Sequence, residues 1–349
     1  MERRISKQVE IADLKIGASA PISVQSMTNT DTRDLEATIK QIKRLEEAGC
    51  ELVRIAIPDD EAAENIAAIK EAIDIPLVAD IHFDYKLALA AMKRNIDGLR
   101  INPGNIGDNK QVKEIAEMAK ERKIPIRVGV NAGSLEKKLL KKYGQPTAEA
   151  MVESALKQIE LLEGFGFRDI IISLKASEVQ LTLEAYRLMA DKVEYPFHVG
   201  ITEAGTVKSG KIKSAVGIGA VLAQGLGDTI RVSLTGDPVE EVKLGFEILK
   251  SLGLREYGVE IISCPTCGRC EIDLVEIAAE IEEELAKIDK QLQVAIMGCV
   301  VNGPGEAKGA DIGIAGGKNQ GLIFKDGEVL KKVPANKLVN ELLAEIEKI

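Results

Sequence analysis

The repeating unit of this chain is first seen in residues 22–49, which read ISVQSMTNTDTRDLEATIKQIKRLEEAG. Residues 22–27 form a short β-branched and apolar run that predicts a strand. Apolar residues then recur at the spacing of one helical face, at Leu35, Ile39, Ile42 and Leu45. Thr32 and Asp34 supply a helix start and Gly49 a stop. The segment therefore predicts one strand followed by one helix.

The same alternation continues to residue 252. Eight strand-like runs can be counted, each followed by a helical stretch: residues 22–27, 52–57, 77–81, 98–102, 126–130, 170–174, 198–202 and 229–234. Eight such units predict an α/β fold of the TIM (β/α)8 barrel type. A doubly wound open sheet competes, but no Gly-x-Gly-x-x-Gly fingerprint follows the first strand. Residues 8–17 alternate at period two and predict a hairpin that closes the barrel bottom.

The alternation breaks between Gly253 and Gly258, where we place a domain boundary. Residues 1–255 are then a substrate-binding barrel and residues 256–349 a second domain. Beyond the boundary we expect a charged helix over residues 273–288, a strand over 293–297, short strands over 311–315, 321–324 and 328–332, and a final helix from Pro334. This pattern predicts a small α+β domain.

Composition narrows the class of protein. The 349 residues are 45% hydrophobic and 29% charged, as in ordinary globular proteins, and no apolar run is long enough to span a membrane. The first residues lack the apolar run of a signal peptide, so we expect a cytoplasmic protein. A net charge of −9 argues against a general nucleic-acid binder, which needs a basic footprint. An anionic ligand must therefore be met by a local cluster of Arg and Lys.

Three of the five cysteines lie within residues 264–270, CPTCGRC. Such spacing can place two sulfurs on one ion or cluster, and by spacing alone Cys270 is favoured as a third ligand. A further cysteine, Cys299, lies in residues 297–306, MGCVVNGPGE. A zinc knuckle is one interpretation, but structural zinc sites usually have four N or S ligands. One cysteine with a carboxylate fits an iron–sulfur cluster with one exchangeable corner better.

Polar residues gather at the carboxyl ends of the predicted barrel strands, where TIM barrels carry their chemistry. Any single charge there can be a simple salt bridge. Five cations at one mouth are harder to explain without a bound anion, because burying like charges is unfavourable; they are Arg54, Arg100, Arg127, Lys175 and Arg231. Arg forks suit phosphate oxygens, which indicates a diphosphate.

Other groups at the strand ends can complete this site. They are Asp80, His82, Asn102, Asn131, Thr202 and Ser233. Glu203 can donate or accept a proton. We interpret His198 as a satisfied core histidine and Cys50 as a small buried apolar residue.

Several stretches carry a resemblance to a known family. They are residues 24–28 (VQSMT), 79–84 (ADIHFD), 100–105 (RINPGN), 127–131 (RVGVN), 200–205 (GITEAG), 264–269 (CPTCGR) and 298–306 (GCVVNGPGE). With them, essentially the whole chain resembles the bacterial 4-hydroxy-3-methylbut-2-enyl diphosphate synthase family of the non-mevalonate isoprenoid pathway. The two cysteine loops are the most diagnostic stretches.

This resemblance implies a two-domain iron–sulfur oxidoreductase. The barrel would bind 2-C-methyl-D-erythritol 2,4-cyclodiphosphate, and a [4Fe-4S] cluster would be held by Cys264, Cys267, Cys299 and Glu306. Cys270, which spacing favoured, is not part of the family's ligand pattern. The reaction implied is a two-electron reductive ring opening and dehydration to (E)-4-hydroxy-3-methylbut-2-enyl diphosphate, with electrons from reduced flavodoxin or ferredoxin.

The resemblance also implies roles and an assembly. The five cations would hold the diphosphate, with Asn102, Asn131, Thr202 and Ser233 adding hydrogen bonds, Asp80 and His82 belonging to the same site, and Glu203 handling protons. A homodimer is implied, in which the cluster domain of one subunit closes the barrel mouth of the other.

Two other classes remain open at this point. One is a zinc-stapled TIM-barrel enzyme that acts on a phosphorylated sugar, and the other is a non-enzymatic iron–sulfur sensor or carrier. The carrier leaves the cations at the barrel mouth unexplained.

Overall fold

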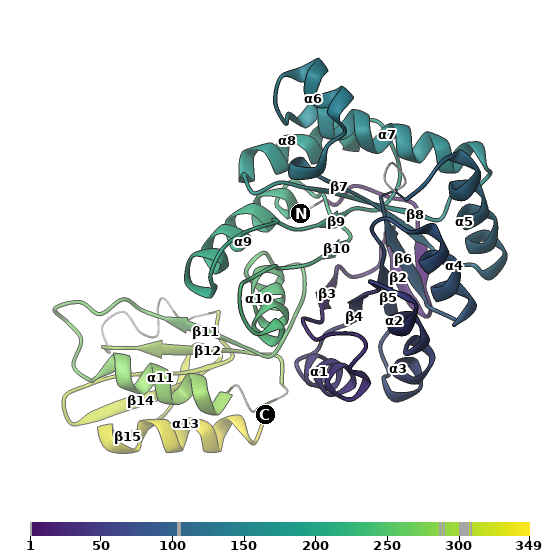
Figure 1. The fold of residues 1–349 in the computed structure, drawn as a ribbon. Coiled ribbons are helices and arrows are strands. Elements are labelled where there is room, and N and C mark those ends of the chain that lie inside the picture. The colour runs from purple at the N-terminus through teal and green to yellow at the C-terminus, as the bar shows by residue number, and fades with distance from the viewer. Residues whose placement is uncertain (1, 103–105, 286–287, 289, 300–306, 308) are drawn as a thin grey trace. The chain divides into compact units, whose positions relative to one another are not determined.

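The structure is a computed structural model that describes residues 2–102, 106–285, 288, 290–299, 307 and 309–349 (Figure 1). The chain divides into two compact units, Met1–Arg255 and Glu256–Ile349. Among the described residues, no helix is both long and apolar enough to cross a membrane.

The first unit is built on a sheet of eight parallel strands. In spatial order they are β8 (Ile170–Lys175), β7 (Ile126–Asn131), β6 (Gly98–Ile101), β5 (Leu77–Asp80), β4 (Leu52–Ala56), β3 (Ser23–Met27), β10 (Thr229–Ile230) and β9 (His198–Val199). A parallel bridge between Ile172 and Phe197 joins β8 to the residue before β9 and so closes the ring. The predicted TIM barrel is confirmed.

Helices follow each strand and lie outside the sheet (Figure 1). They are α1 (Leu35–Glu47), α2 (Asp60–Glu64), α3 (Ile66–Ala72), α4 (Tyr85–Lys93), α5 (Asn109–Arg122), η1 (Ala132–Ser134), α6 (Lys137–Tyr143), α7 (Ala148–Gly164), α8 (Val179–Ala190), α9 (Val207–Leu222) and α10 (Pro238–Ser251). The start of α1 matches the sequence signal, because the Asp34 side chain accepts a hydrogen bond from the backbone N–H of Ala37.

The last two barrel strands are much shorter than predicted. The sequence predicted strands over 198–202 and 229–234, whereas β9 and β10 have two residues each. The backbone at Gly200 is the reason, since a Cβ there would lie 2.4 Å from the carbonyl oxygen of Arg231. The chain leaves the regular ladder at this close approach and reaches Glu203, whose φ of +52° lies in the left-handed region.

The predicted N-terminal hairpin is confirmed as β1 (Val9–Ile11) paired antiparallel with β2 (Leu14–Ile16). Its apolar residues are buried among side chains from the barrel strands: Val9, Ile11 and Ile16 pack with Leu52, Val78 and Ile171. The hairpin therefore forms the floor of the barrel.

The segments that flank the barrel in sequence are tied to strands far from them in the chain. Before the hairpin, the backbone N–H of Arg4 donates to the carbonyl of Gly225 at 2.9 Å, and Ser6 Oγ donates to Asp228 Oδ1 at 2.9 Å. At the other end, Arg255 Nη1 donates to the carbonyl of Ile22 at 2.9 Å. Both ends of the unit thus meet the same side of the barrel, near its first and last strands.

The second unit contains a five-stranded mixed sheet. Its order is β11 (Val259–Ser263), β12 (Leu292–Met297), β13 (Ile312–Ala315), β14 (Gln320–Lys325) and β15 (Glu328–Pro334), with the first three strands parallel and the others antiparallel. Helices α11 (Leu274–Leu285) and α13 (Leu338–Ile346) pack on this sheet through Leu274, Ile281, Leu338 and Leu342. The unit has the predicted α+β character.

One boundary in this unit differs from the sequence prediction. The predicted helix over 273–288 corresponds to α11, described over Leu274–Leu285, and residues 286, 287 and 289 lie outside the described part. The final helix does not start at Pro334, because Pro334 pairs with Gln320 as the last residue of β15. A short turn, η2 (Ala335–Lys337), comes before α13.

Candidate active site

Asp80 is the centre of an ion-pair cluster at the carboxyl ends of β4, β5 and β6. Its Oδ1 accepts a hydrogen bond from Arg100 Nη1 at 3.1 Å, and its Oδ2 lies 3.6 Å from Arg54 Nε. His82 Nε2 lies 3.5 Å from the same carboxylate. Burial alone would raise the pKa of Asp80, but Arg54, His82 and Arg100 outweigh it and hold that pKa well below its ordinary value. The carboxylate is therefore ionised and aligns two of the five cations.

Glu241 is the carboxylate that pairs with Arg231, as Asp80 pairs with Arg54 and Arg100. This carboxylate is on α10, only 4% exposed, and its Oε2 lies 3.5 Å from Arg231 Nε and 3.4 Å from Ser26 Oγ. Its Oε1 accepts from the backbone N–H of Leu234 at 2.8 Å. Burial raises the pKa of Glu241, against the opposing effect of Arg231. The sequence analysis missed this residue, although a Glu on the buried face of a helix, beside Val242, is a recognisable signal.

A methionine sulfur lies between the two groups of cations. Arg54 Nε donates to Met27 Sδ at 3.1 Å, and Arg231 Nη1 lies 3.6 Å from the same atom. Burial, with Arg231 and Arg100 adding to it, lowers the pKa of Arg54 to about 10 despite the attraction of Asp80. The cations are thus close enough to repel one another.

Lys175, at the end of β8, and His198, at the start of β9, are both buried in the barrel. Burial lowers the pKa of Lys175 well below its ordinary value, and Arg231 and Arg54 add to the effect. The Lys175 Nζ has no hydrogen-bond or ion-pair partner among the residues that the structure describes. It lies close to the backbone of Gly200, where a Cβ would be only 2.8 Å from this nitrogen. His198 is buried as expected, but neither ring nitrogen has a partner in the described part, and burial lowers its pKa well below 6.5. The interpretation of His198 as a satisfied core residue is therefore wrong, although its burial is confirmed.

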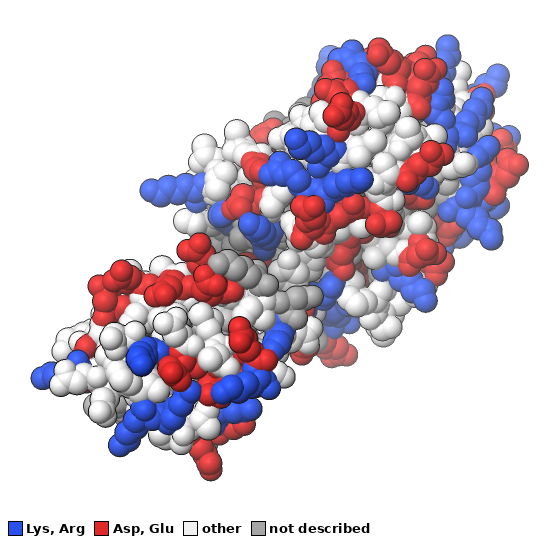
Figure 2. All heavy atoms as spheres, turned by 90° about the horizontal axis from the view of Figure 1, so that it is seen from below, with Lys and Arg blue, Asp and Glu red and all other residues white. Residues whose placement is uncertain are grey.

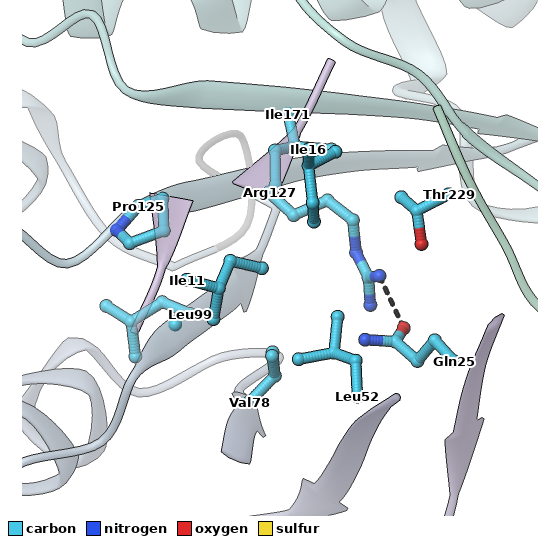
Figure 3. Close-up of a pocket in the computed structure, with 11 residues that line it drawn as sticks. Ile11, Ile16, Gln25, Leu52, Val78, Leu99, Pro125, Arg127, Ile171 and Thr229 are labelled. Carbon is cyan, nitrogen blue, oxygen red and sulfur yellow. Dashed lines mark hydrogen bonds between the residues drawn. The ribbon is translucent and has the colours of Figure 1, made fainter. Parts of the chain in front are cut away.

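Arg127 points toward the barrel floor rather than the mouth (Figure 3). Its Nη1 donates to Gln25 Oε1 at 2.6 Å, and its Nη2 is buried with no partner in the described residues. Burial, with Arg54 and Arg100 adding to it, lowers the pKa of Arg127 well below its ordinary value. Its charge is part of the cluster, but its guanidinium is turned away from the opening.

The other predicted residues lie around the same strand ends. Asn102 follows β6 and is 8% exposed, and Asn131 is the last residue of β7. Thr202 donates its backbone N–H to Ala176 at 3.3 Å, and Ser233 follows β10. Glu203 is exposed, and its left-handed φ is the kind of backbone strain that recurs at functional sites.

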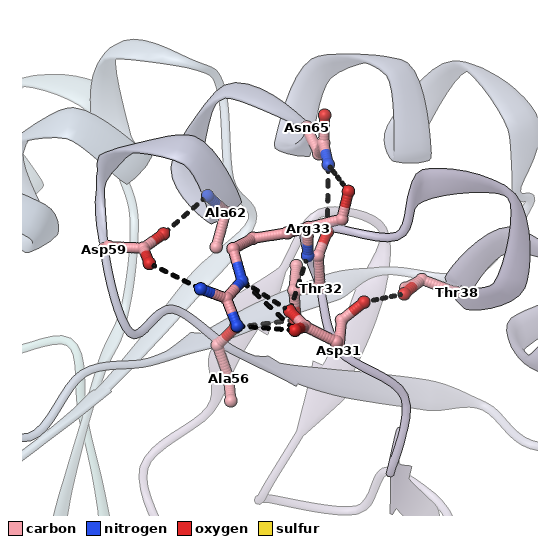
Figure 4. A network of polar contacts seen from close by, with 8 residues as sticks. All are labelled: Asp31, Thr32, Arg33, Thr38, Ala56, Asp59, Ala62 and Asn65. Carbon is pink, nitrogen blue, oxygen red and sulfur yellow. Dashed lines mark hydrogen bonds and ion pairs between the residues drawn. The ribbon is translucent and has the colours of Figure 1, made fainter.

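An exposed polar network joins the loops that follow β3 and β4 (Figure 4). Arg33 Nη2 lies 2.6 Å from Asp31 Oδ2 and Arg33 Nη1 lies 3.4 Å from Asp59 Oδ2. Asn65 Nδ2 donates to the carbonyl of Thr32 at 2.9 Å. The hydrogen bond from Arg33 lowers the pKa of Asp31 to about 2. These contacts tie two loops together at the rim of the barrel.

The molecular surface has a different charge pattern from the barrel interior. On the face shown in Figure 2, positive and negative side chains are interspersed over both units. Inside the barrel, by contrast, Arg54, Arg100, Arg127, Lys175 and Arg231 are offset by two carboxylates in ion-pair contact, Asp80 and Glu241. The interior has an excess of positive charge that suits a multiply charged anion.

The cysteine loops meet at one edge of the sheet in the second unit. Cys264 follows β11, and Cys299 lies two residues beyond β12, the neighbouring parallel strand. Cys264 Sγ accepts a hydrogen bond from the backbone N–H of Gly298 at 3.3 Å. The Cys267 side chain is exposed, and none of the five cysteines forms a disulfide. The two cysteine loops therefore lie next to each other at this edge of the sheet.

Cys270 is held differently from the other cysteines of its loop. Its Sγ donates to the carbonyl of Ile272 at 3.2 Å, and a Cβ at Gly298 would lie 2.6 Å from this sulfur. It also packs against the apolar core of the second unit. These contacts give Cys270 a packing role.

The described residues do not contain a group of three or more His, Cys, Asp or Glu side chains arranged to hold a metal ion. Glu306 lies outside the described residues. Cys50, in the barrel, is buried as expected, and burial raises its pKa to about 12, so it is an unreactive thiol.

Family profiles match both units. The GcpE TIM-barrel domain matches residues 6–246, and the GcpE protein C-terminal domain matches residues 260–348. A curated relative from Caldanaerobacter subterraneus subsp. tengcongensis is 61% identical over 347 residues, which cover 99% of this chain and 98% of the relative. One from Geobacter sulfurreducens is 60% identical over 344 residues, with 99% and 98% covered. Both are named 4-hydroxy-3-methylbut-2-en-1-yl diphosphate synthase (flavodoxin).

Two solved structures are similar to 71% of this chain. A type I 3-dehydroquinate dehydratase from Clostridium difficile is similar with a TM-score of 0.53 at 14% identity, over 71% of this chain and 98% of that one. A dihydropteroate synthase from Xanthomonas albilineans has a TM-score of 0.51 at 14% identity, over 71% and 98%. These similarities show the fold alone. The two matched profiles and the near full-length relatives show that the chain belongs to the GcpE family of 4-hydroxy-3-methylbut-2-en-1-yl diphosphate synthases.

Proposed function

We propose that the chain converts 2-C-methyl-D-erythritol 2,4-cyclodiphosphate to (E)-4-hydroxy-3-methylbut-2-enyl diphosphate by a two-electron reductive ring opening and dehydration. The names of its relatives support the product. The observation that carries the substrate class is the buried cation cluster of the barrel, in which Arg54, Arg100 and Arg231 pair with only two carboxylates, while Arg127 and Lys175 add positive charge without an ion pair in the described residues. A diphosphate supplies the negative charge that this cluster lacks. A non-enzymatic carrier has no use for such a cluster.

The cations have different parts in holding the diphosphate. Arg54 and Arg100 are aligned by Asp80, and Arg231 by Glu241, so their guanidinium groups are oriented before the substrate binds. Lys175 gains an anionic partner on binding, which raises its pKa and favours uptake of a proton from solvent. Arg127 adds to the positive electrostatic potential from the floor side of the barrel. For its guanidinium to contact the diphosphate, it must turn from Gln25 toward the mouth. His82, Asn102, Asn131, Thr202 and Ser233 add hydrogen bonds that fix the orientation of the substrate.

Glu203 is the group that we assign to proton transfer. It is exposed at the mouth, follows Thr202 directly, and is held in a strained backbone conformation. Loss of a hydroxyl group as water requires a proton at the leaving oxygen, which an exposed carboxyl at this position can supply.

The second unit fits a [4Fe-4S] cluster. The thiols of Cys264 and Cys299 emerge from neighbouring parallel strands, and the backbone N–H of Gly298 donates to a sulfur, a contact that tunes the potential of such clusters. We assign Cys264, Cys267 and Cys299 as ligands, with Glu306 as the fourth. When bound, such a cluster would supply electrons one at a time. A carboxylate suits the fourth ligand position because oxygen is a harder, more easily displaced ligand than thiolate.

Reduced flavodoxin or ferredoxin is the proposed electron donor, and flavodoxin is the one that the names of the relatives give. We also propose a cytoplasmic homodimer in which each barrel mouth is served by the cluster domain of the partner. Light scattering on the intact protein checks the dimer directly.

The decisive experiment uses protein purified without oxygen. Iron and acid-labile sulfide should each be present at about four per chain. With chemically reduced flavodoxin, the protein should convert the cyclodiphosphate to the linear diphosphate. Stoichiometric zinc without sulfide, or a loaded protein that leaves the cyclodiphosphate unchanged, would overturn the proposal.

Glu306→Ala separates substrate binding from turnover. The variant should keep most of its affinity for the cyclodiphosphate, because the cations are in the other unit, but lose turnover by at least about a hundredfold. Arg231→Ala is the matched opposite case, with weaker binding and an unchanged cluster spectrum. Near-normal turnover in Glu306→Ala would remove that carboxylate from the mechanism.

A further inference from the structure

A small cavity lies between the barrel strands and the hairpin that forms the floor. Apolar side chains make up most of its wall, among them Ile11, Leu52 and Val78 (Figure 3). Its volume of about 10 Å³ limits it to one small occupant. The reaction proposed above makes no use of this space.

Three polar side chains reach this cavity with hydrogen-bonding atoms that are buried and unpartnered in the described residues. They are Arg127 Nη2, Gln25 Nε2 and Thr229 Oγ1. The residues are 5%, 1% and 1% exposed, so bulk water does not satisfy them. The amide orientation of Gln25 is set by its other atom, because Oε1 must accept the hydrogen bond from Arg127 Nη1. Its Nε2 is therefore left to donate.

We propose that the cavity is a binding site for one halide-class monovalent anion, held by Arg127, Gln25 and Thr229. A buried polar atom without a partner costs free energy, and three in one small cavity indicate a ligand that satisfies them together.

The chemistry of the three groups favours an anion over water. Arg127 and Gln25 can only donate here, and the Thr229 hydroxyl can donate as well, so a single acceptor satisfies all three. A water molecule has two hydrogens of its own to place, and the rest of this wall is largely apolar. Arg127 also has no ion-pair partner among the described residues. An anion in the cavity offsets that buried charge, which a water molecule cannot do.

Bromide can replace chloride and be located by anomalous scattering. Crystals of the full-length, cluster-loaded wild-type protein soaked in bromide should show an anomalous peak between the three side chains. In solution, substrate-free protein should unfold at a Tm about 2 °C higher in sodium chloride than in sodium gluconate of equal ionic strength. No peak at this position while surface bromides are visible, or equal Tm values in the two salts, would overturn the proposal.

Thr229→Val removes one donor while keeping the side-chain volume. This variant should lose the bromide peak and most of the chloride-dependent rise in Tm. Ser214→Ala is the matched control, because Ser214 also has a buried, unpartnered hydroxyl in the described part but does not line the cavity. It should keep the full chloride effect; an equal loss in both variants would show that the chloride effect arises elsewhere. If Thr229→Val does not fold, the bromide and chloride measurements on the wild type still decide the question.

Discussion

The barrel mouth and the cysteine loops present reactive side chains in two different ways. At the mouth, Asp80 and Glu241 align the cations through ion pairs, so the site exists before a ligand arrives. In the second unit, Cys267 is exposed, and no metal-ready group of side chains is present among the described residues. The barrel site is therefore organised by the protein, whereas the cysteine site depends on the group that it holds.

The largest expected effect is in the cysteine loop. Cys264→Ser should lose most bound iron and at least about a thousandfold in turnover, because a hydroxyl is a poor substitute for a thiolate. Cys270→Ser is the comparison within the same loop: its sulfur donates to the carbonyl of Ile272, and a serine hydroxyl can make the same contact, so this variant should keep iron and sulfide near the wild-type level. Iron analysis after anaerobic purification measures both. Loss of iron in Cys270→Ser alone would reverse the assignment of ligands.

The next effect tests whether the mouth is organised without a ligand. Asp80→Asn should lower the free energy of unfolding of the substrate-free barrel by about 3 kcal/mol, because it leaves Arg54 and Arg100 buried without their carboxylate. Urea unfolding measures this. Glu241→Gln leaves only one cation, Arg231, without its carboxylate, so it should cost less.

Inorganic pyrophosphate sharpens the same test. It should stabilise Asp80→Asn more than it stabilises the wild type, because the anion replaces part of the missing negative charge. Equal stability of the variant and the wild type without a ligand would mean that Asp80 does not organise the mouth.

A smaller effect concerns protons. The pKa of Lys175 is lowered by burial and by Arg231 and Arg54, and a bound diphosphate acts in the opposite direction. Between the pKa of the free enzyme and the higher pKa of the complex, binding should therefore take up as much as about one proton. Affinity should fall as pH rises through this interval.

Calorimetric titrations in two buffers of different ionisation enthalpy measure this uptake. Lys175→Met should abolish it, whereas Lys211→Met should not, since Lys211 pairs with Glu240 outside the mouth. Uptake that persists in Lys175→Met would assign the proton to another group.

The smallest effect is at the exposed rim. Arg33→Ala should lower Tm by less than about 2 °C at neutral pH, because exposed ion pairs contribute little. The Asp31 pKa of about 2 lies below the ordinary 3.8, so its contribution is present above about pH 4 and lost as pH falls through about 2. Thermal unfolding of the variant and the wild type at pH 6 and pH 2 measures the difference. A Tm difference that grows toward pH 2 would contradict this origin.

Much of the barrel could be predicted from the sequence because its strands are buried on both sides and read as apolar runs. The run at residues 126–130, for example, corresponds to β7 within one residue. The strands at 198–202 and 229–234 were predicted too long, because the close approach of Gly200 to Arg231 depends on two distant segments. Local composition does not record such a contact.

The cations of the mouth could be listed from sequence because each ends or lies within a strand that could be recognised. The side chains that pair with these cations could not be predicted from the sequence. Glu241 comes from α10, the helix after the last barrel strand, and Met27 contacts Arg54 and Arg231 through tertiary packing. The direction of Arg127, toward Gln25 and the floor, also depends on the hairpin folding into the barrel.

The ties at the two ends of the barrel unit set an order of events during protein synthesis. Arg4 and Ser6 are synthesised first, yet their hydrogen-bond partners Gly225 and Asp228 come more than two hundred residues later. The carbonyl of Ile22 likewise accepts its hydrogen bond from Arg255, at the end of the unit. The ring therefore cannot be completed until nearly the whole first unit has left the ribosome. At about 5–20 residues per second, the earliest strands wait on the order of ten seconds or more for their last partners. A nascent chain with exposed strand edges for that long is a natural client for chaperones.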